Sequence, residues 1–129
     1  MRQAHWVFVR GAVWLYEYYP LIESYFDPPK SLEDLIRDAS LGPSRGYDIH
    51  HIVEQRPAEL DGFPRSLIDG PGNLVRIPRM RHWEVNRWFE TTNRSFNWST
   101  PRQHVRGRDW SERFAVGLLA LEETGILKP

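Results

Sequence analysis

Apolar and polar positions alternate along the chain with periods that predict both helices and strands. Apolar and aromatic residues recur every three or four positions over residues 12–26, which predicts one or two helices, interrupted or kinked at Pro20. Asp27-Pro28-Pro29 ends this segment. A shorter helix is expected over 32–40, because Ser31 is a favourable N-cap and acidic residues follow it in the first turn.

The pattern changes in the middle of the chain. Residues 47–53 have the β-branched content of a short strand. Glycines and prolines are frequent over 54–72, which predicts a loop. Residues 74–77 form a second short strand that Pro78 stops, and a helix should follow over 79–91. The residues expected on its buried side are Val85, Trp88 and Phe89.

The C-terminal part returns to helices after a polar, irregular stretch over 92–99. Thr100-Pro101 is an N-cap followed by proline at the first helical position, which predicts a short helix. Asp109 opens a capping-box pattern for a helix over 110–124, and Gly125 suits the position just after its end.

These elements predict a small α+β domain with a two-stranded antiparallel hairpin and one helix at its centre, embedded among flanking α-helices. We divide it into an N-terminal helical segment (1–45) that packs on the rest, a central unit (46–91) and a C-terminal helical segment (92–129). A length of 129 residues suits a single compact domain built from all three.

Composition excludes several classes of protein. The chain has no cysteine, which removes disulfides, thiolate metal sites and cysteine nucleophiles. No apolar run approaches the roughly 20 residues of a membrane helix. The N-terminus has Arg10 inside its apolar stretch and is a poor signal peptide. We therefore expect a soluble protein without a membrane partner.

The net charge of zero hides an uneven distribution. Residues 1–64 hold 6 basic and 10 acidic residues, whereas 65–113 hold 10 basic and 5 acidic residues, and all ten of those basic residues are arginine. The planar guanidinium suits phosphate, so a local basic face for nucleic acid is one interpretation. Solvated arginines paired with acids are the other.

Polar residues that can bind a metal ion or transfer a proton are concentrated in the central unit. His82 and Asn86 are four residues apart on a predicted helix, so they project from one face. His50 and His51 are adjacent on a strand and point to opposite faces, so one ring can bind a metal ion while the other faces a substrate. Asn73 follows a Gly-Pro-Gly turn, where its amide can brace the loop opposite the histidines and fix ring orientation.

This arrangement resembles the ββα-metal finger of the HNH (His-Me finger) nuclease superfamily, in the double-histidine form of colicin-type DNases and bacterial toxin nucleases. The matching stretches are DIHHIVEQ at 48–55, NLVRI at 73–77 and HWEVN at 82–86. The family has His-His on the first strand, Asn before or on the second, and His-x3-His or His-x3-Asn on the helix. The loop between the first two stretches is longer here than in the colicins.

The resemblance implies metal-assisted hydrolysis of phosphodiester bonds, with 5′-phosphate and 3′-hydroxyl products. By it, His50 and His82 hold one divalent metal ion, and His51 is the general base that activates water. Asn73 orients His51 or shapes its loop. Asn86 stands where some relatives have a third histidine. An amide oxygen is a harder and weaker ligand than imidazole, so we expect Mg²⁺ or Mn²⁺ ahead of Zn²⁺ or Ni²⁺.

The resemblance also bears on partners. DNA is the expected substrate because most relatives cut DNA, and RNA is the alternative. Arg76, Arg79 and Arg81 are expected to hold the phosphate backbone. The domain is cytoplasmic, or it is delivered into a target cell as part of a larger toxin, in which case an immunity protein is an expected partner. A non-catalytic, metal-stabilised module that binds nucleic acid or protein is a hypothesis from another class.

Some residues have two interpretations. Asp48 either pairs with Arg45 or accepts a hydrogen bond from a histidine N–H, and Glu54 is similarly ambiguous. Asn86 either binds the metal or faces solvent. Four tryptophans can stack on bases or lie in the core, and the core is favoured. They are Trp83, Trp88, Trp98 and Trp110.

Overall fold

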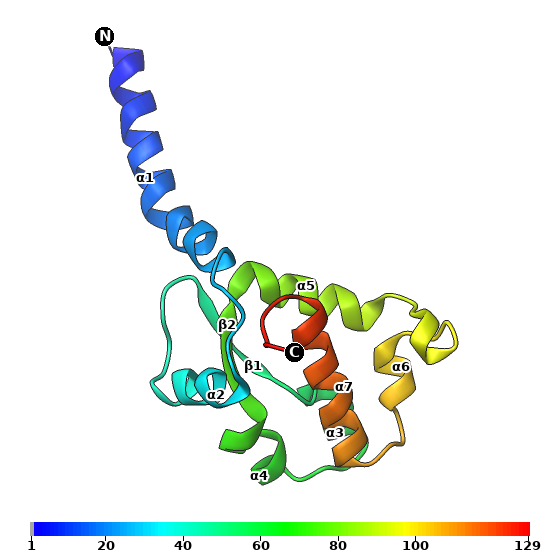
Figure 1. The fold of residues 1–129 in the computed structure, drawn as a ribbon. Coiled ribbons are helices and arrows are strands. Elements are labelled where there is room, and N and C mark those ends of the chain that lie inside the picture. The colour runs from blue at the N-terminus through cyan, green and yellow to red at the C-terminus, as the bar shows by residue number, and fades with distance from the viewer. Residues whose placement is uncertain (1) are drawn as a thin grey trace.

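The computed structural model describes the backbone of residues 2–129 and the side chains of Val7 and of residues 9–129. It is an α+β fold with one two-stranded antiparallel sheet and helices around it (Figure 1). The elements are α1 (Arg2–Tyr25), α2 (Leu32–Ser40), β1 (Tyr47–His51), α3 (Gln55–Leu60), α4 (Arg65–Ile68), β2 (Leu74–Pro78), α5 (Arg79–Glu90), α6 (Pro101–Val105) and α7 (Trp110–Glu123). Among the described helices, none combines the length and the apolar character needed to cross a membrane.

The predicted hairpin is present. β1 and β2 pair antiparallel, with Tyr47 opposite Pro78 and His51 opposite Leu74. α5 begins at the residue after β2. The order of strand, connection, strand and helix therefore follows the prediction, although β1 ends at His51 rather than at residue 53.

The connection between the strands is not the loop that its glycines and prolines predicted. It contains the short helices α3 and α4. Pro57 is the third residue of α3, where a missing N–H costs no intrahelical hydrogen bond, and Pro64 is the N-cap of α4. Proline is tolerated at these helix starts, so its presence here did not exclude helix.

The core lies between the hairpin and the helices that follow it. Val75 and Ile77 of β2 pack with Val85 and Phe89 of α5, and α7 adds Leu121. α7 approaches the chain directly after β1. A Cβ atom at Gly117 would collide with the carbonyl oxygen of Ile52, so the glycine permits this approach. The end of β1 is thereby held against a rigid helix.

The predicted helix starts are confirmed. Ser31 accepts a hydrogen bond from the Asp34 N–H, and Asp109 accepts one from the Glu112 N–H. Thr100 forms a full capping box with Gln103. These caps use side chains within three residues of the helix start, which is why sequence alone located them.

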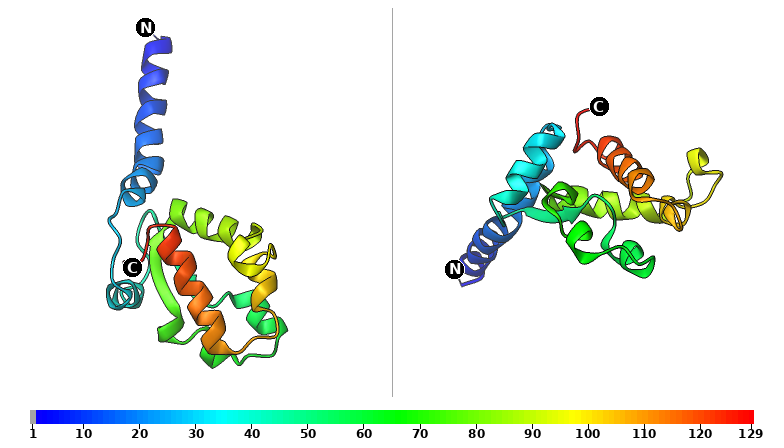
Figure 2. Two further views of the ribbon diagram at one scale, coloured as in Figure 1. Left: turned by 45° about the vertical axis from the view of Figure 1, so that its right-hand side comes forward. Right: turned by 90° about the horizontal axis from the view of Figure 1, so that it is seen from below.

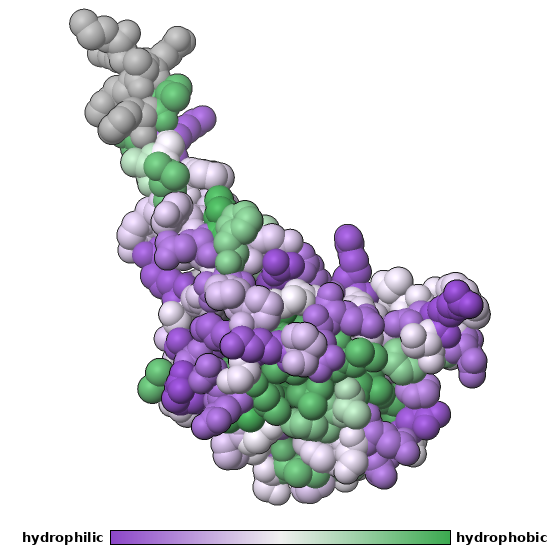
Figure 3. Space-filling view, in the orientation of Figure 1, coloured by the Kyte–Doolittle hydropathy of each residue, from purple (hydrophilic) through white to green (hydrophobic). Residues whose placement is uncertain are grey.

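The N-terminal helix differs from expectation. α1 continues through Pro20 as one helix and extends away from the body of the molecule (Figures 1 and 2). Its C-terminal part is fastened by hydrogen bonds from Ser24 to the Gly46 carbonyl, from Tyr25 to Glu84 and from Arg45 to the Tyr16 carbonyl. Trp14 is 50% exposed on the projecting part, and Figure 3 shows hydrophobic residues at the surface along it. Most of the described part of α1 therefore does not pack on the domain.

Two of the four tryptophans also differ from expectation. Trp83 and Trp98 are 56% and 66% exposed, whereas Trp88 and Trp110 pack partly against the core. Val85 and Phe89 occupy the buried face of α5, and Trp83 lies two residues before Val85, off that face.

Candidate metal and catalytic site

The hairpin and the first turn of α5 bring two histidine rings together. His50 of β1 and His82 of α5 have ring centroids 5.0 Å apart in an edge-on arrangement. The alternation of β1 turns His50 toward the helix and into the protein, where its residue is 5% exposed, and leaves His51 partly open. The two adjacent histidines therefore have different environments, as the sequence predicted.

His50 is suited to bind a metal ion. Burial, with smaller contributions from His82 and His51, lowers the pKa of His50 to about 3, so the ring is neutral at physiological pH. Its Nε2 atom is buried and has no hydrogen-bond partner among the described residues. A buried polar atom without a partner is unfavourable. Binding a metal ion is one way for a neutral imidazole to satisfy it.

His82 is oriented by an acid on β1. Its Nδ1 atom lies 2.9 Å from Asp48 Oδ2, and Arg79 Nε donates to Asp48 Oδ1 at 2.9 Å. Although burial raises it, these hydrogen bonds hold the pKa of Asp48 below its usual value. A carboxylate only accepts hydrogen bonds, so the His82 proton is on Nδ1 and Nε2 is available as a ligand. Of the two interpretations of Asp48, the structure has the one in which Asp48 accepts a hydrogen bond from a histidine. Arg45 instead donates to the Tyr16 carbonyl.

His51 has a different acidic partner, Asp69. His51 Nε2 lies 2.9 Å from Asp69 Oδ1, and Arg65 Nε lies 3.2 Å from Asp69 Oδ2. The carboxylate places the His51 proton on Nε2 and leaves Nδ1 as a base. Asp69 is not among the residues predicted from the sequence, because it lies in the segment that the pattern predicted to be a loop. An acid just before the Gly-Pro-Gly turn that leads to Asn73 was the only local signal.

Asn73 has a structural role. It is 2% exposed, and its side chain accepts from the Val53 N–H at 2.8 Å and donates to the carbonyls of Val53 and Ile68. All three partners are backbone groups, and none is His51. Of the two predicted roles, Asn73 therefore shapes the connection around the histidines and does not orient the ring directly.

The histidines line one cleft with a volume of about 700 Å³. Asn86 is exposed and lines the same cleft, so it can reach the space that His50 and His82 share. The other wall comes from α3 and from the region of α6. Three cleft arginines belong to that wall: Arg56, Arg102 and Arg106.

The predicted phosphate-binding arginines lie elsewhere. Arg76, Arg79 and Arg81 are absent from the cleft lining. Arg76 donates to the Gly42 carbonyl, Arg79 supports Asp48, and Arg81 pairs with Glu84 and lies over the Tyr25 ring. Their charges are engaged within the protein, and the arginines that line the cleft with the histidines are Arg56, Arg102 and Arg106.

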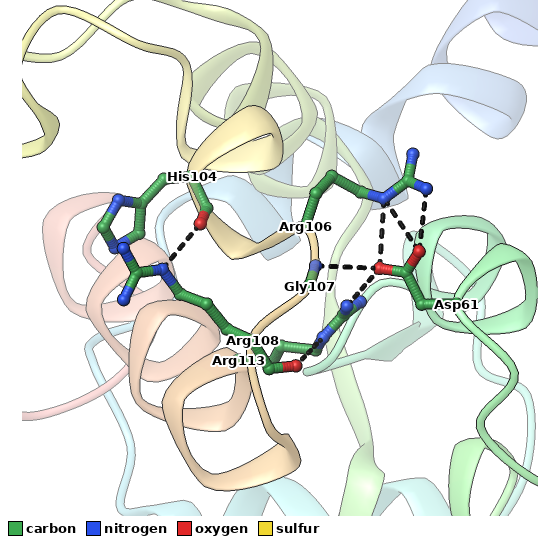
Figure 4. Close-up of polar contacts among 6 residues, drawn as sticks. All are labelled: Asp61, His104, Arg106, Gly107, Arg108 and Arg113. Carbon is green, nitrogen blue, oxygen red and sulfur yellow. Dashed lines mark hydrogen bonds and ion pairs between the residues drawn. The ribbon is translucent and has the colours of Figure 1, made fainter.

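Acids fix two of the cleft arginines. Glu54 accepts hydrogen bonds from Arg102 Nε and Nη2, which resolves its ambiguity, and Arg102 Nη1 reaches Glu90 at 3.0 Å. Asp61 at the end of α3 accepts from Arg106, from the Gly107 N–H and from the buried Arg113 (Figure 4). Ion pairs therefore join α3, α6 and α7 along the far wall of the cleft.

The cleft offers few side chains of the types that bind metal ions. Within the part of the chain that the structure describes, no three His, Cys, Asp or Glu side chains converge on a metal position. His50, His82 and the amide of Asn86 are the side chains that fit the role, which leaves positions for substrate and water.

Comparisons with family models, with curated proteins and with solved structures gave no match.

Proposed function

We propose that this chain is a metal-dependent endonuclease that hydrolyses phosphodiester bonds of DNA, and that β1, β2 and α5 form its ββα-metal finger. The observation that carries the proposal is the unlike pair of adjacent histidines. One is buried, neutral and unpartnered beside His82, and the other is held by Asp69. Both line one cleft that arginines also line.

In this proposal His50 and His82 hold the metal ion, and Asn86 adds an oxygen ligand. Asp48 fixes the His82 tautomer. The bound ion supplies positive charge that stabilises the phosphate and the leaving oxygen. The amide oxygen favours Mg²⁺ or Mn²⁺ over Zn²⁺ or Ni²⁺.

His51 performs the proton transfer. Its Nδ1 atom accepts a proton from the attacking water, while Asp69 keeps Nε2 protonated and stabilises the imidazolium that forms. Arg56 of the far wall, which makes no ion pair with any described residue, positions the phosphate backbone without reading sequence. This assignment moves the phosphate contacts from the three arginines predicted at first to the cleft.

The direct test is a plasmid-nicking assay with Mg²⁺, Mn²⁺, Ni²⁺ or Zn²⁺ and an EDTA control, with wild-type protein beside His51→Ala. His104→Ala is the matched control, because His104 lies outside the cleft lining. We expect metal-dependent nicking that His51→Ala lowers by about 10²-fold or more and that His104→Ala retains. Circular dichroism establishes that each variant is folded.

The alternatives give different results. Metal- and His51-dependent cleavage of RNA but not of plasmid would identify a ribonuclease with the same site. A folded protein that binds metal yet cuts neither substrate would indicate a non-catalytic module.

A further inference from the structure

The cleft is lined by two apolar side chains that the fold leaves exposed. Ile49 of β1 is 37% exposed and Leu60 of α3 is 60% exposed, and both line the cleft with the histidines. Phosphate binding has no use for such a surface. Exposed apolar groups beside a candidate catalytic site indicate contact with an apolar part of the substrate.

The same short helix carries a cation toward this cleft. Arg56 lines it and makes no ion pair with any described residue, whereas acids hold Arg102 and Arg106. α3 therefore offers an uncommitted guanidinium beside Pro57 and about one turn from Leu60. A charged group next to an apolar surface matches a nucleotide, which has an anionic phosphate and a base with apolar faces.

The volume of the cleft is compatible with one nucleotide. A volume of about 700 Å³ lies within the range of roughly 300–1,000 Å³ for pockets that enclose small ligands. In a duplex the base faces are stacked inside, and only base edges are reached through the grooves. An unpaired nucleotide can enter the cleft and place its base on Ile49 and Leu60.

We infer that the cleft takes an unpaired segment of nucleic acid, with a base beside the scissile phosphate resting on Ile49 and Leu60 and a neighbouring phosphate at Arg56. This inference rests on the proposed nuclease function and names its substrate class. Single strands, loops and frayed ends are then the preferred substrates. Intact duplex is cut slowly, through transient opening of base pairs.

The test compares one labelled 30-nucleotide DNA as a single strand, as a perfect duplex and as a duplex with a central unpaired bubble. Wild-type protein with the metal that best supports nicking should have a kcat/KM about tenfold higher for the single strand and the bubble than for the duplex. Cuts in the bubble substrate should fall within the unpaired segment. An RNA strand of the same sequence tests the sugar separately.

Substitutions at Leu60 and Arg56 test whether these residues contact the unpaired strand. Leu60→Ala should lower single-strand kcat/KM by about five- to tenfold, mainly through KM, and should also slow the duplex reaction, because opened base pairs use the same contact. The matched control is Leu67→Ala, an exposed leucine of α4 outside the cleft lining, which should change neither. Arg56→Ala should weaken single-strand binding and reduce its salt dependence.

The experiments distinguish loss of the preference for unpaired strands from loss of the nuclease activity itself. His51-dependent cleavage at least as fast on duplex, or insensitivity to Leu60→Ala, overturns the inference and leaves the nuclease. If no nucleic acid is cut, fluorescence anisotropy with the single strand and the duplex decides. Preference for the single strand that Leu60→Ala abolishes supports an unpaired-strand site, and equal or absent binding overturns it.

Discussion

At the scale of single residues, two of the three candidate histidines have a carboxylate on one ring nitrogen, and the third is buried without a partner on Nε2. Asp69 holds Nε2 of His51, Asp48 holds Nδ1 of His82, and Nε2 of His50 has no partner among the described residues. Because imidazole has two unlike nitrogens, a carboxylate on one determines which chemistry the other can perform. The two acids are therefore positioning residues.

Asp69→Asn should lower kcat by about 10- to 100-fold with little change in KM, because the amide can donate to Nε2 and favour the wrong tautomer. Steady-state cleavage of an oligonucleotide measures both parameters. Asp34→Asn, which alters an exposed acid of α2, is the control. An unchanged kcat would remove Asp69 from the mechanism.

Asp48→Asn should weaken metal binding by about 10- to 100-fold, since Asp48 fixes the ring of the proposed ligand His82. Isothermal titration with Mn²⁺ measures this without any nuclease reaction. Asp69→Asn is the internal comparison and should retain Mn²⁺ affinity. Equal affinities for wild type and Asp48→Asn would contradict the assignment of His82 as a ligand.

At the scale of elements, the side chains of one buried amide and one acid hold the connection between β1 and β2 in place. Asn73 closes the segment on the backbone of Val53 and Ile68, and Asp61 fastens the end of α3 to α6 and α7. Both residues hold elements whose side chains line the cleft, but neither is proposed to bind metal or substrate. Substituting Asn73 or Asp61 should therefore lower the free energy of unfolding.

Asn73→Ala should lower the free energy of unfolding by about 2–4 kcal/mol, since it leaves buried backbone groups of Val53 and Ile68 without partners. Urea denaturation measures the difference. Asn86→Ala supplies the opposite profile, because Asn86 is exposed and should affect metal binding but not stability. A wild-type midpoint for Asn73→Ala would show that water replaces the amide.

Asp61 makes stability depend on acid pH. Hydrogen bonds from Arg106, then Arg113 and the Gly107 N–H, lower the pKa of Asp61. A carboxyl with a lower pKa in the folded state contributes fully above its unfolded pKa of about 4 and loses that contribution as pH falls below it. Thermal melts at pH 7 should show a lower Tm for Asp61→Asn, and the gap should narrow below pH 4. A gap that stays constant with pH would contradict this role.

At the scale of the whole molecule, stability resides in the body and not in the projecting helix. Phe89 is 2% exposed in the core, whereas Trp14 is 50% exposed on α1. Phe89→Ala should lower the free energy of unfolding by about 3–5 kcal/mol, and Trp14→Ser should change it by less than about 0.5 kcal/mol. Chemical denaturation measures both. A large loss for Trp14→Ser would mean that α1 packs on the body in solution.

Local patterns located most elements, and their failures have local causes. Ser31, Thr100 and Asp109 marked helix starts because caps act within one turn. The segment 54–72 was misread because proline breaks helices only beyond the first turn, and Pro57 and Pro64 lie at helix starts. Within the predicted 1–45 segment, Leu35 of α2 lies in the core, whereas the described part of α1 leaves apolar side chains such as Trp14 exposed.

By itself the sequence determined the hairpin followed by a helix, and the placement of His50, His51 and His82 on it. Strand alternation and helix periodicity are properties of neighbouring residues, so they can be read locally. Only the tertiary structure decided that Asp69 serves His51, that Asp48 serves His82, and which arginines face the cleft. The chain has many acids and arginines of equal chemistry, and partners within hydrogen-bonding distance are selected by the path of the folded backbone.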